Sequence, residues 1–200
     1  MAATDTRAAI VEAADRLFYE NGFASTSFAD IAAAVKLSRG NFYYHFKSKD
    51  EILAAVIALR LERTKLLLTT WDGEGEDAEA RILSFIGILI ANRVKIMRFG
   101  CPVGTLCNEL AKLDHAAGAD AARLFALFRN WLARQFRDLG HGEAEADRLA
   151  MHLLARSQGV ATLASSIGDE AFIDAEVAEM RGFVAAHRRP AAHRRPAAHA

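Results

Sequence analysis

The segment from Ser25 to Leu53 constrains the fold more than any other part of the chain, because three helix starts follow one another closely. Ser27 and Ser38 can each cap a short helix, and Ser48 opens an S-x-x-E capping box at the start of a longer one. Behind each cap, apolar residues recur at helical spacing, so each helix has a face that packs on a neighbour. This arrangement is typical of a helix-turn-helix.

The second short helix has two chemically different faces. Phe42 and Phe46 lie one turn apart on the face expected to point inward. The other face carries side chains that can bond to phosphates or to base edges. The chain has zero net charge, but four cations and one anion lie between Lys36 and Asp50. The sequence therefore predicts a local surface for a polyanion on a neutral protein.

Several linked motifs in this region carry a family resemblance. They are Gly22-Phe23, Thr26-Ser27, Ile31-Ala32, Leu37-Ser38-Arg39-Gly40, Phe42-Tyr43-Tyr44-His45-Phe46 and Lys47-Ser48-Lys49-Asp50-Glu51-Ile52-Leu53. Together they resemble the N-terminal DNA-binding domain of TetR-family transcriptional regulators. With the side-chain chemistry, this resemblance predicts DNA contacts by Thr26, Ser27, Lys36, Ser38, Arg39, Gly40, Asn41, Tyr43, Tyr44, His45 and Lys49.

Within this set we expect two kinds of contact. Arg39, Asn41 and Tyr44 are expected to face bases. Phosphate contacts are expected from Thr26, Ser27, Tyr43, His45 and Lys49. The family usually has Gly in the turn where this chain has Lys36, and Lys tolerates a positive φ at a cost of about 1 kcal/mol. Lys36 is therefore expected to strain the turn slightly and to add a phosphate contact.

The whole chain is predicted to be all-α. Strong helix formers dominate, only three prolines occur, and two of them are in the last eleven residues. Its 200 residues, 52% of them hydrophobic, are enough for one large or two small folded domains. We expect a three-helix helix-turn-helix domain over 1–48, a helical effector-binding and dimerisation domain over 49–186, and a disordered Arg/His/Pro tail over 187–200.

Apolar spacing and helix stop signals predict the individual helices. The ranges outside the two short helices are 6–21, 49–71, 77–95, 102–113, 116–139, 143–167 and 170–186. In the last two helices, small residues alternate with aliphatic ones and permit close helix approach. They form either an ordinary intrachain core or, as the resemblance implies, a two-fold four-helix interface in a homodimer.

The resemblance also implies a pocket for a small hydrophobic or amphipathic effector. The candidates are Phe85, Leu89, Asn92, Met97, Phe125, Phe128 and Trp131. Each of them is also compatible with a plain core position. Asn92 is the most suggestive, because a polar amide stands in an apolar segment that is expected to be buried.

Cys101 and Cys107 allow a different kind of sensing. If Pro102 starts a helix, the two cysteines are about 9 Å apart along its axis, too far for a relaxed disulfide within that helix. The helix dipole favours a reactive thiolate at Cys101, whereas Cys107 is expected to be structural. A repressor that senses oxidants or electrophiles through Cys101 is therefore an alternative to one that binds an effector.

Other function classes find little support. The chain carries no recognisable catalytic motif, so we expect no enzyme, metal site or cofactor. No apolar run is long enough for a membrane span, and the N-terminus does not resemble a signal peptide, so we expect a cytoplasmic protein. The prediction is a homodimeric regulator, most simply a repressor, that binds double-stranded operator DNA. The alternatives are an activator, an architectural DNA binder, and a helical small-molecule-binding protein that no longer reads DNA.

Overall fold

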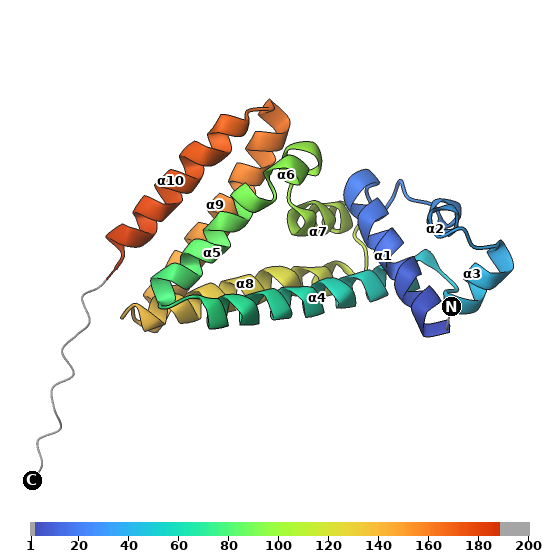
Figure 1. Ribbon diagram of the computed structural model, residues 1–200, viewed down its shortest axis with the longest axis horizontal. Coiled ribbons are helices and arrows are strands. Elements are labelled where there is room, and N and C mark those ends of the chain that lie inside the picture. Colours follow the sequence, from blue (N-terminus) through green and yellow to red (C-terminus); the bar gives the residue numbers. More distant parts are fainter. Residues whose placement is uncertain (1–2, 189–200) are drawn as a thin grey trace, which may run out of the picture. The chain divides into compact units, whose positions relative to one another are not determined.

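The computed structural model describes residues 3–188, and for residues 3–5 and Arg39 it describes the backbone alone. All regular structure in this part of the chain is α-helical, which confirms the predicted class (Figure 1). The helices are α1 (Ala3–Asn21), α2 (Phe28–Ala34), α3 (Arg39–His45), α4 (Lys49–Glu74), α5 (Ala78–Ala91), α6 (Arg93–Phe99), α7 (Pro102–Lys112), α8 (Gly118–Asp138), α9 (Glu143–Ile167) and α10 (Glu170–Ala186). None of these helices combines the length and the apolar character needed to cross a membrane.

The described chain packs into two compact units. The first contains residues up to 67 together with 94–127, and the second contains 68–93 together with the described residues after 127. Helices α4 and α8 each contribute residues to both units. The first part of α4 packs with α1, α2 and α3 because Ile52, Leu53 and Val56 are fully buried in their common core.

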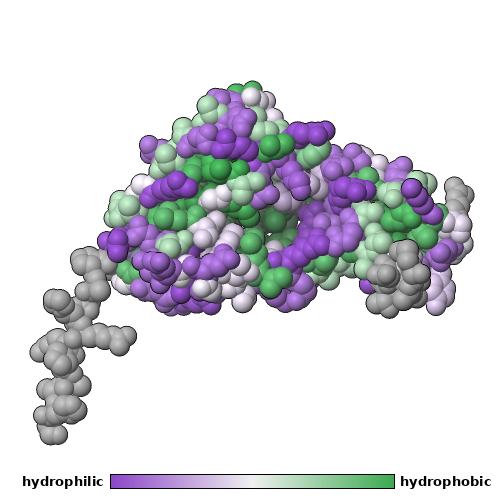
Figure 2. Space-filling view, in the orientation of Figure 1, coloured by the Kyte–Doolittle hydropathy of each residue, from purple (hydrophilic) through white to green (hydrophobic). Residues whose placement is uncertain are grey.

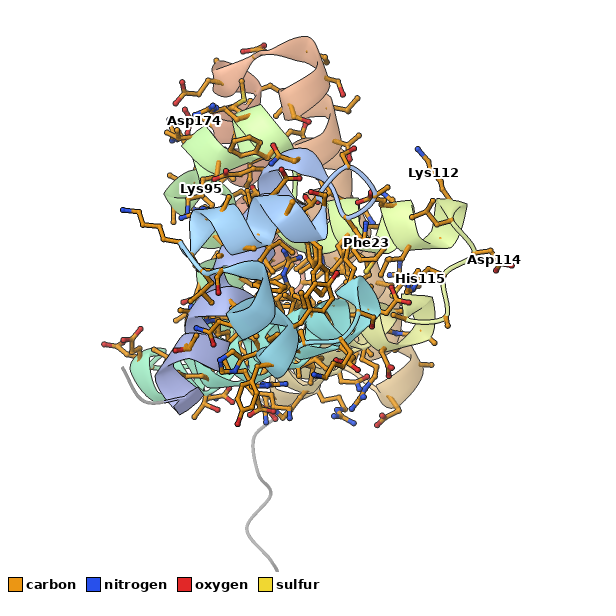
Figure 3. All side chains as sticks on the ribbon, turned by 90° about the vertical axis from the view of Figure 1, so that its right-hand side faces the viewer. Phe23, Lys95, Lys112, Asp114, His115 and Asp174 are labelled. Carbon is orange, nitrogen blue, oxygen red and sulfur yellow. The ribbon has the colours of Figure 1, made fainter. Side chains whose placement is uncertain are left out.

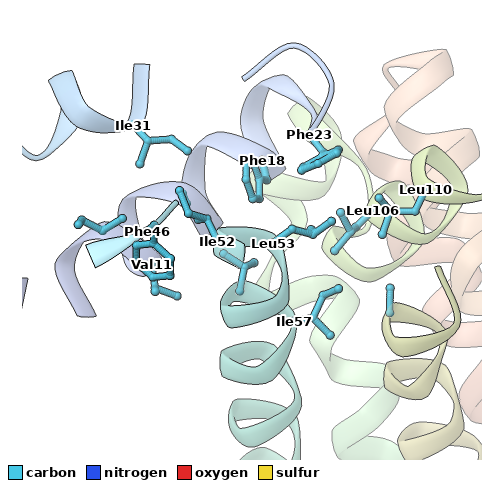
Figure 4. Close-up of a cluster of buried hydrophobic side chains, with 14 of the residues drawn as sticks. Val11, Phe18, Phe23, Ile31, Phe46, Ile52, Leu53, Ile57, Leu106 and Leu110 are labelled. Carbon is cyan, nitrogen blue, oxygen red and sulfur yellow. The ribbon is translucent and has the colours of Figure 1, made fainter. Parts of the chain in front are cut away.

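The core of the first unit is built from apolar residues of α1, α2, α3, α4, α7 and α8 (Figure 4). Phe18 of α1 meets Phe23 edge to face, with ring centroids 5.2 Å apart. Leu106 and Leu110 of α7 complete the same cluster and are almost fully buried. Gly22 ends α1 in the left-handed conformation with φ of 88°, which glycine adopts readily at a helix C-terminus. Helix α7 is therefore an integral part of the unit that contains the helix-turn-helix.

A buried arginine joins three elements of the first unit. Arg60 of α4 is 8% exposed, and its Nε donates to Asp15 Oδ1 of α1 at 2.5 Å. Its Nη1 donates to the carbonyl of Pro102, the first residue of α7, at 2.6 Å. Nearby, the Tyr19 hydroxyl donates to the carbonyl of Gly100, and burial raises the pKa of Tyr19 to about 12. A buried charge without partners costs much free energy, so Arg60 needs its bonds to both Asp15 and Pro102. They hold α1 and α7 against α4.

The predicted single helix over 77–95 is wrong, because the chain breaks at Asn92. Helix α5 ends at Ala91, Asn92 is its C-cap with φ of −107°, and α6 begins at Arg93. The amide Nδ2 of Asn92 donates to the carbonyl of Ile88, so this side chain satisfies the end of the helix instead of continuing it. The spacing of apolar residues does not reveal this break, because apolar residues continue on both sides of it.

In the second unit, α10 packs along α5 and α9. The end of α4 is joined to α8 by Trp71 and Trp131, whose ring centroids lie 5.5 Å apart. The Asp72 carboxylate accepts hydrogen bonds from Trp131 Nε1 at 3.0 Å and Gln135 Nε2 at 3.3 Å. An ion pair with Arg134 adds a third contact to Asp72. Polar bonds therefore reinforce the apolar contact between these helices.

The chain remains packed on the second unit for two residues beyond α10. His187 is the C-cap of α10, and its carbonyl accepts a hydrogen bond from Nε2 of His141 at 2.7 Å. Arg188 pairs with Glu79 at 3.3 Å. The remainder of the predicted tail, 189–200, lies outside the described residues.

Candidate nucleic-acid interface

The turn between α2 and α3 is closed by a residue in the left-handed conformation. Lys36 has φ of 55°, which confirms the expected positive value. Its N–H donates to the carbonyl of Ala33, and the N–H of Leu37 donates to the carbonyl of Ala32, both at 3.1 Å. These are the two bonds of a Schellman motif. The side chain of Lys36 is exposed, so the strained position presents a cation to solvent.

Replacing Lys36 by glycine should raise the free energy of unfolding by about 0.5–1 kcal/mol, because glycine adopts positive φ without the steric penalty of a Cβ atom. Urea denaturation followed by circular dichroism measures the change. Asp114 is a matched control, since it has φ of 47° at the equivalent position after α7. Asp114→Gly should stabilise to a similar extent. If only Asp114→Gly does so, the strain assigned to Lys36 is absent.

Helix α3 begins and packs as the sequence predicts. The Ser38 hydroxyl accepts a hydrogen bond from the N–H of Asn41 at 3.4 Å, which confirms the cap. Phe42 and Phe46 are each 1% exposed, and Phe42 meets Phe28 of α2 edge to face at 4.7 Å. The apolar side of α3 is thereby fixed against α2 and the core.

The opposite side of α3 is open to solvent. Its exposed residues are Gly40, Asn41, Tyr43 and Tyr44. Tyr44 is 73% exposed, and the ring of the half-buried His45 lies edge to face against it at 5.2 Å. The side chain of Arg39, the remaining predicted contact on this helix, lies outside the described residues. Large aromatic groups with polar tips thus stand on an exposed surface, where an intrachain core would have buried them.

The predicted cap at the start of α2 is confirmed, and it forms a complete capping box. Ser27 Oγ accepts from the N–H of Asp30 at 3.1 Å, and the Asp30 carboxylate accepts from the N–H of Ser27 at 2.8 Å. Bonds from the Ser27 hydroxyl and then from its backbone N–H lower the pKa of Asp30. The capping box therefore stabilises the folded state fully at pH values above the ordinary carboxyl pKa. This stabilisation is lost as the pH falls through the lowered pKa of Asp30.

Two predicted phosphate contacts are turned inward. Thr26 is 1% exposed, and its hydroxyl donates to the carbonyl of Gly22 at 2.7 Å. Lys49 Nζ donates to the carbonyls of Phe23 at 2.9 Å and Thr26 at 3.2 Å, and it lies 4.3 Å from the centroid of the Phe23 ring. Both side chains therefore hold the link between α1 and α2. Their contacts with DNA remain a prediction.

The start of α4 uses its capping residues in a shifted way. Helix α4 begins at Lys49 as predicted, and Ser48 Oγ accepts from the N–H of Glu51 at 3.1 Å. The Glu51 carboxylate accepts from the N–H of Lys47 at 2.8 Å, one residue earlier than in a standard capping box. Lys47 Nζ donates to the carbonyl of Tyr43 at 2.5 Å. This network ties the end of α3 to the start of α4.

The predicted effector residues are divided between the units. Phe85, Leu89, Asn92, Phe128 and Trp131 are in the second unit, whereas Met97 and Phe125 are in the first. Phe85 and Phe128 are brought together with ring centroids 5.7 Å apart. The expected burial of Asn92 is wrong: the residue is exposed and caps α5. Its amide is therefore unsuited to the role of a polar group inside an apolar pocket.

The two cysteines are free thiols, and both are half-buried. Cys101 is the N-cap of α7 and precedes Pro102, as predicted, and its thiol makes no capping bond. Cys107 packs against the core of the first unit, and burial raises the pKa of its thiol. Cys107 therefore suits the structural role expected for it, while the reactivity of Cys101 stays a prediction.

Two contacts of the first unit were missed by the sequence-based prediction. Glu109 of α7 accepts hydrogen bonds from the N–H groups of Phe23 and Ala24, each at 2.8 Å. Arg7 of α1 lies over the ring of Phe46, 4.7 Å from its centroid. These partners are separated by 39 or more residues in the sequence, so no local motif connects them. Nothing in the sequence around Glu109 distinguishes it from an ordinary charged residue of an amphipathic helix.

Family comparisons agree with this geometry. Residues 10–56 match the family model described as "Bacterial regulatory proteins, tetR family". Residues 85–179 match a second model, described as the C-terminal domain of LmrA/YxaF-like transcriptional regulators. The first match covers the helix-turn-helix and the start of α4, and the second covers most of the helices that follow α4.

Individual proteins show the same likeness. An HTH-type transcriptional repressor from Mycobacterium tuberculosis is 44% identical over 148 residues, which cover 74% of this chain and 70% of the relative. An HTH-type regulator from the lacX 3' region of Lactococcus lactis is 29% identical over 78% of this chain and 81% of its own length. A crystal structure of a TetR-family regulator from Agrobacterium tumefaciens has the same fold. It superimposes with a TM-score of 0.81 at 19% identity, covering 91% of this chain and 98% of that one.

Proposed function

Because the chain belongs to the TetR family of bacterial regulatory proteins, we propose that it is a dimeric repressor that reads operator DNA with α3. The observation that carries this proposal is the division of α3 into a buried face, with Phe42 and Phe46, and an exposed polar and aromatic face. A regulator of this kind works in the cytoplasm, where the bacterial chromosome lies.

Exposure and hydrogen bonding suggest how the contacts are shared. Asn41 and Tyr44 are exposed on α3 and are proposed to face base edges, together with Arg39. Phosphate contacts are proposed for Tyr43 and Lys36, whose side chains are exposed beside the turn. The remaining predicted contacts stabilise this surface. Ser27 and Ser38 cap α2 and α3, and Gly40 leaves space for close approach. Thr26 and Lys49 bond to backbone carbonyls next to α2, and His45 packs against Tyr44.

Members of the family bind DNA as dimers, and we propose that α9 and α10 form the interface. Figure 2 shows apolar residues gathered over α5, α9 and α10 on the face in view. The exposed small or apolar positions include Ala155, Gly159, Thr162 and Leu163 on α9, and Ala171, Ala175, Ala178 and Gly182 on α10. Small exposed residues on two adjacent helices allow a partner's helices to approach closely. Two-fold symmetry then presents two copies of α3 to successive major grooves, about 34–36 Å apart.

Release by a small hydrophobic or amphipathic effector is proposed from the aromatic content of the helices after α4. Phe85 and Phe128 meet within the second unit, and Trp131 is beside the polar group of Asp72. Aromatic walls with a few polar groups suit such a ligand. A fluorescence titration with candidate effectors, which reports on the neighbouring Trp71 and Trp131 together, tests this part of the proposal when it is compared with their effect on DNA binding.

The test of DNA binding is a fluorescence anisotropy titration with fragments from the region upstream of the protein's own gene, repeated at several salt concentrations. Affinity should fall steeply as salt rises, because phosphate contacts release counterions. Lys36→Met should weaken binding to all sequences alike and reduce the salt slope by about 1. Asn41→Ala should weaken the specific site by about 1–3 kcal/mol while sparing unrelated DNA.

Lys95→Met is the matched control, since Lys95 is an exposed cation on α6, outside the helix-turn-helix. It should leave both affinity and salt slope close to those of the wild type. A monomeric wild-type protein with no salt-dependent binding to any duplex would refute the proposed function.

A further inference from the structure

The link between α1 and α2 is held on its N–H side by α7. The two carboxylate oxygens of Glu109 accept one hydrogen bond each, from the N–H groups of Phe23 and Ala24, both at 2.8 Å. Gly22 permits this approach: a Cβ atom there would lie 3.1 Å from Glu109 Oε1, and its φ of 88° disfavours a side chain. Bonds of N–H groups to an ionised acceptor are among the stronger ones in proteins.

The carbonyl side of the same link is held by α4. Lys49 Nζ donates to the carbonyls of Phe23, Ala24 and Thr26 at 2.9, 3.4 and 3.2 Å. The link thus lies between a carboxylate of α7 and an ammonium group of α4, and the next residue, Ser27, caps α2. Because Ser27 follows the link directly, a displacement of the link would move the N-terminus of α2.

The segment after α7 adds a contact to the link that Glu109 and Lys49 hold. His115 meets the ring of Phe23 edge to face at 5.2 Å, and Figure 3 shows the two side chains next to each other. His115 Nδ1 accepts the N–H of Ala117 at 3.1 Å, so Nε2 carries the hydrogen that faces Asp50 of α4 at 3.4 Å. The segment after α7 therefore contacts both the link and the first turn of α4.

We propose that Glu109 is a positioning residue for DNA binding: its carboxylate holds the 22–26 link so that α2 and α3 keep the orientation that fits the major groove. This inference rests on the proposed function and deepens it, because it names a residue outside the helix-turn-helix that sets the orientation of the reading surface. None of the residues predicted from sequence to contact DNA lies on α7.

The docking of α7 does not depend on Glu109. Leu106 and Leu110, 2% and 0% exposed, anchor the helix in the apolar core, and Arg60 binds its first turn through the carbonyl of Pro102. Glu109 itself is half-buried at the edge of that core. Loss of its carboxylate should therefore release the link while α7 stays in place. Positioning and general stability can be separated on this basis.

Glu109→Gln in the full-length protein is the appropriate test. Glutamine keeps the shape of the side chain but has a single acceptor oxygen. Its NH2 group, which is a donor, would face the second N–H and could not accept its hydrogen bond. Operator affinity should fall about tenfold, the effect of losing a hydrogen bond to a charged group. Amide hydrogen exchange of Phe23 and Ala24 should become faster, while the circular dichroism spectrum stays that of the wild type.

Glu62→Gln is the matched control, because Glu62 is an exposed carboxylate on α4 in the same unit and makes no bond to the link. Both variants lose one negative charge, which by itself strengthens binding to DNA. The positioning role therefore predicts effects of opposite sign: weaker binding for Glu109→Gln, and unchanged or slightly tighter binding for Glu62→Gln.

The outcomes distinguish this inference from the function on which it rests. If the wild-type protein binds its operator and Glu109→Gln binds equally well or more tightly, the positioning role is overturned. Unchanged amide exchange at residues 23 and 24 overturns it too, whatever the affinity. Failure of the wild type to bind DNA refutes the proposed function instead.

Discussion

Replacing Phe42 by alanine should lower the free energy of unfolding by about 3–5 kcal/mol, because a fully buried aromatic ring is removed and leaves a cavity. Phe42 is 1% exposed and meets Phe28 at 4.7 Å between ring centroids. A domain has only about 5–15 kcal/mol of stability, so the variant should be largely unfolded at moderate urea concentrations. Urea denaturation followed by circular dichroism measures the loss.

Tyr44→Ala provides the control on the same helix, two residues away. Tyr44 is 73% exposed, so its removal should change stability by no more than about 0.5 kcal/mol. Operator affinity should nevertheless fall by about tenfold, since a predicted base contact is lost. Stability and binding thus respond to opposite faces of α3. Strong destabilisation by Tyr44→Ala, or mild destabilisation by Phe42→Ala, would show that α3 is packed the other way round.

Gly159→Arg should convert the dimer to a monomer and reduce operator affinity by at least about 100-fold, because simultaneous binding of two half-sites is lost. Gly159 is exposed on α9, and among the described residues nothing outside its own stretch of helix lies within 4 Å of the position of an added Cβ. An arginine there is compatible with the folded subunit but obstructs a closely packed partner helix. Light scattering after size-exclusion chromatography measures the mass, and anisotropy measures the affinity.

Gly73→Arg makes the same chemical change in α4, at another exposed glycine with open space around it. This variant should remain dimeric and bind the operator as the wild type does. If Gly159→Arg is also dimeric at the same protein concentration, the proposed interface is incorrect and the subunits associate through another surface.

Local signals made much of the fold predictable. The caps at Ser27 and Ser38, the stop at Gly22 and the start of α7 at Pro102 each depend on residues within four positions of one another. The positive φ at Lys36 followed from the position of that residue in the turn. Such features are set by backbone geometry and short-range hydrogen bonds, which the order of residues expresses directly.

Contacts between distant residues were not predictable in this way. The partners Glu109 and Phe23 are 86 positions apart, and Lys49 is 26 positions from Phe23. The charge of Lys49 suggested a phosphate contact, and no role was predicted for Glu109. In the folded chain both side chains bond to backbone groups of the link between α1 and α2. Asn92 was misplaced for a different reason, because the apolar residues around it indicated burial and concealed its role as a cap.

The buried guanidinium of Arg60 has a consequence for how related sequences can diverge. One of its partners, the carbonyl of Pro102, is a main-chain atom that persists whatever amino acid occupies that position. Asp15 also supplies a main-chain carbonyl, but its carboxylate is a side-chain group that a single codon change can remove. A lineage that lost this carboxylate would carry an uncompensated charge in its interior, and lysine could not reproduce the forked geometry. Positions 15 and 60 are therefore expected to be inherited as a pair.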